Sequence, residues 1–110
     1  MYFKTYYVYI LTNPRNRVFY TGVTNDLERR TAEHRNKKYK GFTSRYNVTK
    51  LVYYEIHDMI DEAISREKQI KRYTRSRKEE IITEFNYKWE DLFKNGKILK
   101  PNKKDCKSDN

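Results

Sequence analysis

Residues 5–12 constrain the fold more than any other segment, because they form an uninterrupted run of β-branched, aromatic and aliphatic side chains. Such a run is typical of a well-buried β-strand. Hydrophobic residues make up only 36% of the 110-residue chain, so the core that buries this strand must be small. Eleven tyrosines supply further bulk, since a tyrosine ring packs while its hydroxyl stays polar. We expect one compact domain.

A second strand is predicted over residues 18–23, and residues 13–16 supply the turn between the two strands. Proline fixes one backbone angle of this turn, and asparagine tolerates unusual ones. If the loop has four residues, the register pairs Thr12 with Arg17, Leu11 with Val18, Tyr9 with Tyr20 and Tyr7 with Gly22. Tyr9 and Tyr20 would then stand side by side on one face of the hairpin, and Gly22 would leave space next to them.

Further segments have the patterns of helices and strands. Residues 27–34 follow the helix-capping residues 24–26, residues 49–57 form a third strand, and a helix capped by Asp58 or Asp61 runs to about Tyr73. Another helix is expected at 75–85, followed by a hydrophobic patch of Trp89, Leu92 and Phe93. Within residues 35–45 we expect an irregular exposed loop that ends near Gly41, and we expect residues 94–110 to be a disordered basic tail, which leaves residues 1–93 as the folded domain.

Charged residues lie on the apolar sides of two predicted helices. Leu27, Arg30 and His34 share a narrow stripe of the first helix. In the later helix, Glu67 falls in the middle of an apolar arc formed by Ile60, Ala63, Ile64 and Ile70. Desolvating an unpaired carboxylate is costly. Glu67 therefore pairs with Lys71 or with an arginine elsewhere, or it belongs to a functional site.

The composition favours a polyanionic partner. The chain carries 25 Lys and Arg against 15 Asp and Glu, a formal charge of +10, and each phosphate contact releases condensed counterions. Basic side chains concentrate in residues 66–78 and in residues 35–45, where aromatic residues suited to base stacking lie among them. The candidate nucleic-acid contacts are Arg35, Lys37, Lys38, Lys40, Arg45, Lys71, Arg72 and Arg75.

Cys106 is the only cysteine, which excludes an intramolecular disulfide and a cysteine-rich zinc site. Residues 1–11 alternate like a strand and do not resemble a signal peptide. No apolar run approaches the roughly 20 residues that span a bilayer. We expect a cytoplasmic protein with no membrane partner, and a monomer by default.

The unusual residues together match the requirements of phosphodiester cleavage. An activated water must attack phosphorus, and the extra negative charge must be stabilised. Tyrosine accepts or relays a proton when a nearby cation or metal lowers its pKa, and arginine grips phosphate oxygens through its planar fork. A single glutamate with water ligands suits Mg²⁺.

The order and spacing of these residues resemble the GIY-YIG nuclease superfamily. Tyr7-Val8-Tyr9 and Tyr20-Thr21-Gly22 resemble the two motifs that name it, and Arg30 lies eight residues after the motif glycine, ahead of His34. Residues 66–71 resemble the metal-binding segment and place its glutamate at Glu67, and Asn86 is a weaker match to a late asparagine. The similarity covers residues 6–93 and is greatest to short, stand-alone bacterial members, which are related to the N-terminal nuclease domain of a DNA-repair excinuclease.

By implication the fold is α+β, a three-stranded antiparallel β-sheet flanked by helices, and the reaction is metal-dependent hydrolysis of a nucleic acid, usually DNA. The resemblance implies that Tyr9 or Tyr20 assists deprotonation of water, Arg30 holds the scissile phosphate, His34 supports the phosphate or the proton relay, and Glu67 ligates one Mg²⁺ or Mn²⁺ ion. Asn86 would be an additional site residue. The chain departs from the motifs at Tyr7, in place of a glycine, at Thr21, in place of an isoleucine, and at Val23, where some relatives have a lysine.

Other readings stay open beside the nuclease. Taken singly, Tyr9 and Tyr20 would be ordinary cross-strand packing, Arg30 a surface arginine and the basic stretches solvated faces. The motif departures also allow a non-catalytic nucleic-acid-binding module on the same fold, and the charge allows an RNA- or ribosome-associated protein. The presence of both Arg30 and Glu67 favours the nuclease, because a domain without activity has no reason to keep a carboxylate on an apolar helix face.

Overall fold

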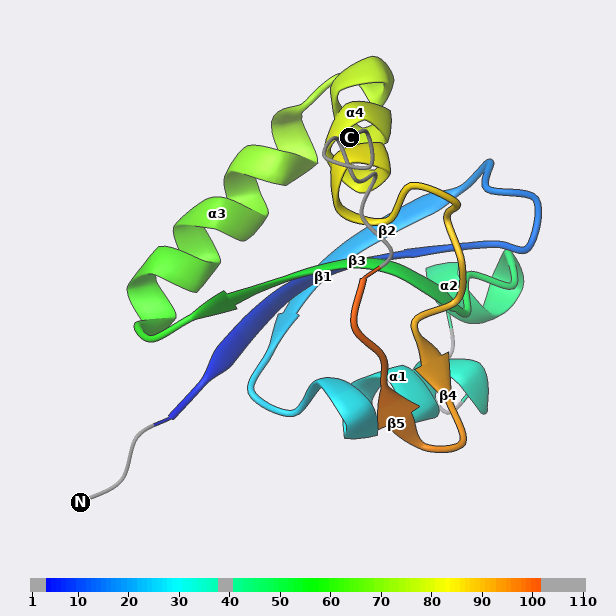
Figure 1. The fold of residues 1–110 in the computed structure, drawn as a ribbon, viewed down its shortest axis with the longest axis horizontal. Coiled ribbons are helices and arrows are strands. Elements are labelled where there is room, and N and C mark those ends of the chain that lie inside the picture. The colour runs from blue at the N-terminus through cyan, green and yellow to red at the C-terminus, as the bar shows by residue number, and fades with distance from the viewer. Residues whose placement is uncertain (1–3, 38–40, 102–110) are drawn as a thin grey trace, which may run out of the picture.

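The computed structural model describes residues 4–37 and 41–101. Its centre is an antiparallel sheet in the order β2-β1-β3, formed by β1 (Tyr6–Thr12), β2 (Phe19–Thr24) and β3 (Lys50–His57). One face is covered by α3 (Ile60–Arg72) and α4 (Arg75–Phe85), and the other by α1 (Leu27–Arg35), the short α2 (Phe42–Arg45) and the hairpin of β4 (Phe93–Lys94) and β5 (Lys97–Ile98) (Figure 1). The predicted α+β class and its three-stranded sheet are confirmed.

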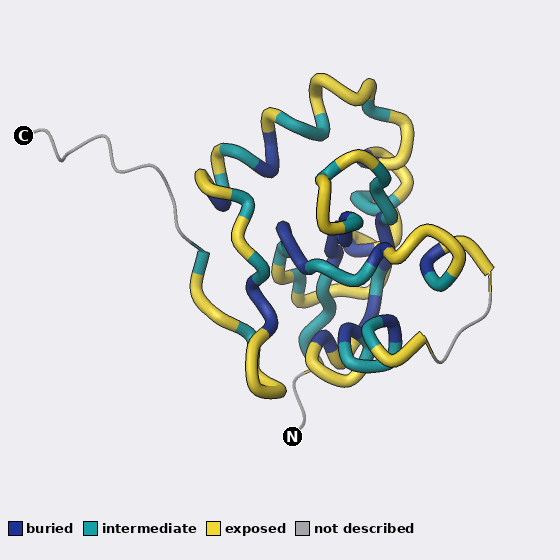
Figure 2. The backbone as a smooth tube through the Cα atoms, turned by 90° about the vertical axis from the view of Figure 1, so that its right-hand side faces the viewer, coloured by how far each residue is buried: buried dark blue, intermediate teal, exposed yellow. Residues whose placement is uncertain are grey.

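The sheet divides the core into two layers, because alternate side chains of a strand point to opposite faces. Val8 and Ile10 of β1 pack in the layer of α3 and α4, with Ala63, Ile70, Ile81 and Ile82. Tyr9 and Leu11 pack in the layer of α1 and the β4–β5 hairpin, with Leu27, Val48, Leu51, Leu92 and Phe93. The central strand β1 is buried from residue 8 to residue 12, and Figure 2 shows the buried segments gathered in the interior.

The register of the β1–β2 hairpin differs from the predicted one by two residues. Tyr9 pairs with Gly22 and Leu11 with Tyr20, so the connection runs over residues 13–18. Asn13 explains the longer loop. Its side-chain oxygen accepts hydrogen bonds from the backbone N–H groups of Arg17 (2.7 Å) and Val18 (3.0 Å), so these two groups do not take part in the hydrogen bonds between β1 and β2. A shift of two leaves every side chain on its predicted face, so Tyr9 and Tyr20 still share one face as diagonal neighbours.

The helices begin and end near their predicted positions, and one predicted cap is wrong. Asp26 caps α1 by accepting a hydrogen bond from the backbone N–H of Arg29 (3.1 Å), and α4 covers the residues predicted for it. The prediction that Asp58 or Asp61 caps α3 is wrong, because the cap residue of this helix is Met59, whose side chain makes no capping hydrogen bond.

The apolar arc of α3 is narrower than predicted. Ala63 and Ile70 are fully buried against the sheet, whereas Ile60 and Ile64 are 41% and 37% exposed. Glu67 lies between Ala63 and Ile70 on the same side of the helix, and only 12% of its side chain is exposed. The expectation that this carboxylate lies on the buried face is therefore confirmed.

Regular structure extends into the predicted loop and into the predicted tail. Residue 35 completes α1, so the irregular segment begins one residue later than predicted, and α2 begins at residue 42, directly after Gly41, near which the loop was predicted to end. Residues 93–98 form the β4–β5 hairpin, which backbone hydrogen bonds from Leu92 to Leu51 (2.8 Å) and from Leu99 to Leu92 (2.7 Å) attach to the domain. The folded domain therefore extends beyond residue 93, and residues 102–110 of the predicted tail lie outside the described residues.

The predicted hydrophobic patch closes one end of the core. Leu92 and Phe93 are buried, and the Trp89 ring packs 5.9 Å from that of Phe19 while its indole N–H donates to Thr83 (2.9 Å). None of the helices in residues 4–37 and 41–101 is long and apolar enough to cross a membrane.

Candidate active site

The ring of Tyr9 lies directly over Gly22 on the neighbouring strand. A Cβ atom built on Gly22 would lie 2.5 Å from the Tyr9 hydroxyl oxygen and 2.6 Å from Tyr9 Cζ, closer than real Cβ atoms are found. Tyr9 is fully buried, so its ring cannot move away without disturbing the core residues packed around it. The second motif therefore needs glycine because the tyrosine of the first motif occupies the place of its side chain.

His34 of α1 contacts both motif tyrosines. Its Nε2 lies 3.2 Å from the Tyr9 hydroxyl, its Nδ1 lies 3.1 Å from the Thr43 hydroxyl, and its ring centroid is 5.2 Å from that of Tyr20. Burial lowers the pKa of His34 and the positive charge of Arg30 lowers it further, against an opposing effect of Glu33. The imidazole is therefore neutral near pH 7, with one nitrogen that donates a proton and one that accepts.

Arg30 lies one helical turn before His34 on the same side of α1. Its guanidinium Nε is 3.6 Å from a carboxylate oxygen of Glu33, and 32% of the Arg30 side chain is exposed. The effect of Arg30 on the pKa of His34 shows that its charge lies close to the imidazole. Arg30 thus supplies a partly solvent-exposed cation close to His34, and its planar guanidinium group is suited to a phosphate contact.

Glu67 is on the opposite side of the sheet from these residues. It belongs to α3, whose Ala63 and Ile70 pack in the layer of Val8, whereas Tyr9 packs in the layer of α1. Its carboxylate forms an ion pair with Lys71 at 2.6 Å, so the predicted pairing four residues apart is present. The structure therefore brings Tyr9, Tyr20, Arg30 and His34 together, and it separates Glu67 from them by the thickness of the sheet.

Among the described residues, Glu67 offers a single carboxylate to a metal ion and no full protein cage. Within the described residues, no three His, Cys, Asp or Glu side chains gather into a metal-binding group. Mg²⁺ commonly takes one or two carboxylates and fills its other positions with water and phosphate oxygens. Glu67 supplies one such carboxylate, and its partner in this structure is the ammonium group of Lys71.

A polar cluster next to Glu67 attaches α3 to β3. Arg66 donates from Nε to both carboxylate oxygens of Glu55 (3.0 and 2.9 Å) and from Nη1 to the Tyr73 hydroxyl (3.0 Å). Glu55 also accepts a hydrogen bond from Tyr53 and lies 3.0 Å from Nε2 of His57. Burial raises the pKa of Glu55, but these hydrogen bonds outweigh it and hold the pKa below its usual range. The orientation of α3, and with it that of Glu67, is set by this cluster.

Two of the predicted nucleic-acid contacts donate hydrogen bonds to the backbone of the domain. Arg35 pairs with Asp91 (2.8 Å) and donates to two backbone carbonyls, and Arg75 pairs with Glu79 (3.1 Å) and donates to two carbonyls of the β1–β2 loop. We therefore leave Arg35 and Arg75 out of the proposed binding surface. Of the others, Lys37, Arg45, Lys71 and Arg72 are exposed, and Lys38 and Lys40 lie outside the described residues.

Asn86 joins α4 to the neighbouring strand. It is fully buried at the C-terminal cap of α4, and its side-chain amide donates to the backbone carbonyls of Val52 (3.1 Å) and Glu90 (2.8 Å). Its side-chain oxygen accepts from the backbone N–H of Glu90 (3.2 Å). Because these polar atoms are used in packing α4 against β3, we do not retain Asn86 in the proposed site.

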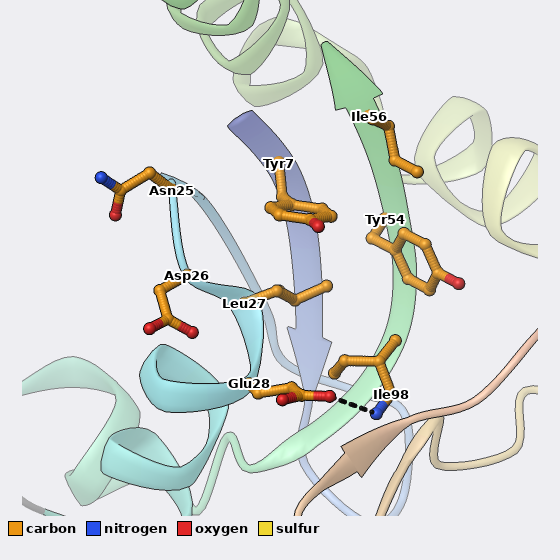
Figure 3. Close-up of a pocket in the computed structure, with 8 residues that line it drawn as sticks. All are labelled: Tyr7, Asn25, Asp26, Leu27, Glu28, Tyr54, Ile56 and Ile98. Atoms are coloured by element: carbon orange, nitrogen blue, oxygen red, sulfur yellow. Dashed lines mark hydrogen bonds between the residues drawn. The ribbon is translucent and has the colours of Figure 1, made fainter. Parts of the chain in front are cut away.

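A cavity of about 410 Å³ lies at the N-terminal end of α1 (Figure 3). Tyr7 and Tyr54 line it with their rings 6.5 Å apart, together with Ile56, and Asp26 and Glu28 stand along α1. Among the described residues that line it, none is a predicted catalytic residue and none is basic. Because its carboxylates repel phosphate, this cavity does not suit the scissile group.

Sequence reasoning did not identify Thr43 and Glu33 as parts of the site. Thr43 is buried, and its hydroxyl lies next to the second nitrogen of His34. Glu33 influences both Arg30 and His34. Thr43 has no spacing signal, because its contact with His34 forms only when α1 and α2 pack together, whereas the spacing of Arg30 and Glu33 is that of neighbours on one helix.

The chain is similar in sequence to proteins of one known family. The family model described as the GIY-YIG catalytic domain matches residues 5–80. A UPF0213 protein of Clostridium perfringens is 40% identical over 88 residues, which are 80% of this chain and 94% of the relative. One of Haloquadratum walsbyi is 38% identical over 79 residues, 72% of this chain and 88% of the relative. A solution structure of the Bacillus halodurans UPF0213 protein is 30% identical, with a TM-score of 0.46 over 72% of this chain and 83% of that one. The chain belongs to the GIY-YIG family, whose catalytic domain implies a nuclease.

Proposed function

We propose that the protein is a metal-dependent endonuclease that hydrolyses phosphodiester bonds of DNA. The observation that carries this proposal is the hydrogen-bonded series Tyr9–His34–Thr43, with Tyr20 and Arg30 beside it. A phenylalanine would fill the space of Tyr9 without a buried hydroxyl to satisfy, so packing alone does not require this series. Such a series supports proton transfer next to a phosphate.

Tyr20 is the tyrosine that we assign to the attacking water. It is half-buried and reaches solvent, whereas Tyr9 is fully buried. The ring centroids of Tyr9 and Tyr20 lie 6.3 Å apart, so Tyr9 orients the Tyr20 ring. Tyr9 also bonds to the neutral imidazole of His34 and so links Tyr20 to a proton acceptor. Because Tyr9 and Thr43 engage both nitrogens of His34, we assign the histidine to the proton relay and Arg30 to the phosphate.

Glu67 would hold the divalent ion, Mg²⁺ or Mn²⁺, in place of its ion pair with Lys71. Such an ion, when bound, stabilises the negative charge that develops on the phosphate and on the leaving oxygen. β2 is an edge strand, and the Tyr9 ring lies across it over Gly22. We infer that the scissile phosphate binds along this edge, where Arg30 approaches from one layer and Glu67 from the other.

A DNA strand along this edge would also meet exposed basic residues of both layers. Lys37 and Arg45 lie in the layer of α1 and α2, and Arg72 lies in the layer of α3. The formal charge of +10 supports binding to a polyanion. We therefore propose DNA as the partner, with RNA as the comparison that a binding assay should include.

The test is a cleavage assay on single-stranded, duplex, flapped and branched DNA with Mg²⁺, Mn²⁺ or EDTA. Wild type is compared with Glu67→Gln, which removes the charge and keeps the shape, and with Glu62→Gln, the same change at an exposed position of the same helix. We expect metal-dependent cutting that falls by at least about 100-fold in Glu67→Gln and is unchanged in Glu62→Gln.

Equal activity of both variants would contradict the role of Glu67. Salt-sensitive DNA binding without cutting in any metal, unchanged by Glu67→Gln, would instead support the non-catalytic binding module. The motif departures at Tyr7 and Thr21 give that second function its basis. Thr21 is buried on the face of Ile10, and Tyr7 packs against Tyr54, so both departures are accommodated by packing outside the Tyr9–His34 contact.

A further inference from the structure

We propose that Phe42 and Tyr46 form a stacking platform for an unpaired nucleobase, which makes DNA with single-stranded segments the preferred substrate class. This inference rests on the proposed function and names the substrate of the same site. Phe42 is 49% exposed and Tyr46 is 46% exposed, although both are large aromatic residues. Their ring centroids lie 5.0 Å apart at an interplanar angle of 50°, and the guanidinium carbon of Arg45 lies 5.9 Å from the centre of the Tyr46 ring.

The platform is held at a defined place beside the candidate active site. Thr43 is the residue after Phe42, and its buried hydroxyl lies 3.1 Å from Nδ1 of His34. The Thr43 carbonyl also accepts a hydrogen bond from the backbone N–H of Val48 (2.8 Å), which ties the end of α2 to the core. Figure 1 shows α2 on the same side of the sheet as α1. A base on the platform would therefore belong to the strand whose phosphate lies near His34.

The chemistry of the platform favours a nucleobase over an apolar protein partner. A base stacks on exposed aromatic rings whatever its identity, because every base has a π-face, and arginine adds a cation next to the backbone phosphate. Arg45 on α2 and Lys37 just after α1 supply positive charge here, in a chain with a net charge of +10. Bases of a duplex are already stacked within the helix, so only an unpaired base is free to bind to these rings.

The test measures binding in EDTA, where cleavage is absent, by fluorescence anisotropy at one fixed salt concentration. The probes are a single strand of about 12 nucleotides, the same backbone with abasic sites, and a duplex of equal length. The proteins are wild type, the double variant Phe42→Ala/Tyr46→Ala, and Tyr87→Ala, which removes another tyrosine that is 46% exposed. Tyr46→Phe keeps the aromatic ring and serves as the rescue variant.

We expect the double variant to bind the single strand between about fivefold and 150-fold more weakly than wild type, the range for losing one stacked base. Tyr87→Ala and Tyr46→Phe should bind like wild type, and affinity for the duplex should change by less than about twofold. The abasic strand should bind wild type and the double variant equally, because it keeps the phosphates and removes the bases.

Equal losses on the intact and abasic strands, or no loss on either, would overturn the platform. The inference is also wrong if wild type binds the abasic strand as tightly as the intact strand and a protein competes with the single strand for this surface. That pair of results would show that the surface binds protein. The two proposals fail separately. Cleavage without any preference for unpaired bases overturns the platform alone, and single-strand preference without cleavage overturns the nuclease function alone.

Discussion

The contact between Tyr9 and Gly22 makes Gly22→Ala the sharpest test of the site geometry. The new Cβ would lie 2.5, 2.6 and 3.0 Å from the Oη, Cζ and Cε1 atoms of Tyr9, about 1 Å inside the usual contact distance for carbon atoms of about 3.5–4.0 Å. The backbone of Gly22 does not have a positive φ, so a strained backbone is not the cause of the cost. On conformational grounds alone, alanine in a strand should stabilise by about 0.5–1 kcal/mol over glycine.

The overlap must therefore be relieved by the Tyr9 ring. Overpacking a filled core costs about 1–3 kcal/mol. If the ring moves, the hydroxyl also loses its bond to His34, which costs about 0.5–1.5 kcal/mol. We expect a net loss of about 1–3 kcal/mol in the free energy of unfolding, together with a loss of cleavage.

A double-mutant cycle separates this clash from other effects of the substitution. Urea unfolding would be measured for wild type, Gly22→Ala, Tyr9→Leu and the double variant. In the Tyr9→Leu background the Gly22→Ala cost should disappear, because the ring atoms that it meets are absent. A Gly22→Ala protein as stable as wild type, or a cost that persists beside Leu at position 9, would refute the reasoning.

Two further predictions follow from the same group of residues. Tyr20→Phe should lower the cleavage rate by about 100-fold or more, with little loss of stability. Tyr9→Phe should lower the free energy of unfolding by about 0.5–1.5 kcal/mol and lower the cleavage rate less than Tyr20→Phe does. If Tyr9→Phe instead lowers the rate more, the attacking water belongs to Tyr9. The pKa of His34 is lower in the folded protein than its ordinary value of about 6.5. Between these two pKa values the unfolded chain binds more protons than the folded protein, so stability falls as the pH drops below about 6.5. The urea midpoint should therefore decline from pH 7 to pH 5, and His34→Gln should reduce that slope; an unchanged slope would contradict a neutral buried histidine.

Much of the fold could be predicted because its signals are local. The apolar run of β1 and the helix over 75–85 follow from residue type and periodicity within a few neighbours. The loop after β1 and the β4–β5 hairpin could not be predicted in the same way. The first depends on the side chain of Asn13, which bonds to its own loop, and the second is attached to the domain by a backbone hydrogen bond from Leu92 to Leu51, some 40 residues earlier in the chain.

The sequence by itself determined which residues form the candidate site, through the order and spacing of Tyr9, Tyr20, Arg30 and Glu67. Only the tertiary structure decided how they are placed. It put Tyr9 against Gly22, gave His34 a second partner in Thr43, and set Glu67 on the other layer beside the Arg66–Glu55 cluster. The physical reason is that spacing along the chain fixes the face of a strand or helix, whereas contacts between faces depend on how separate elements pack.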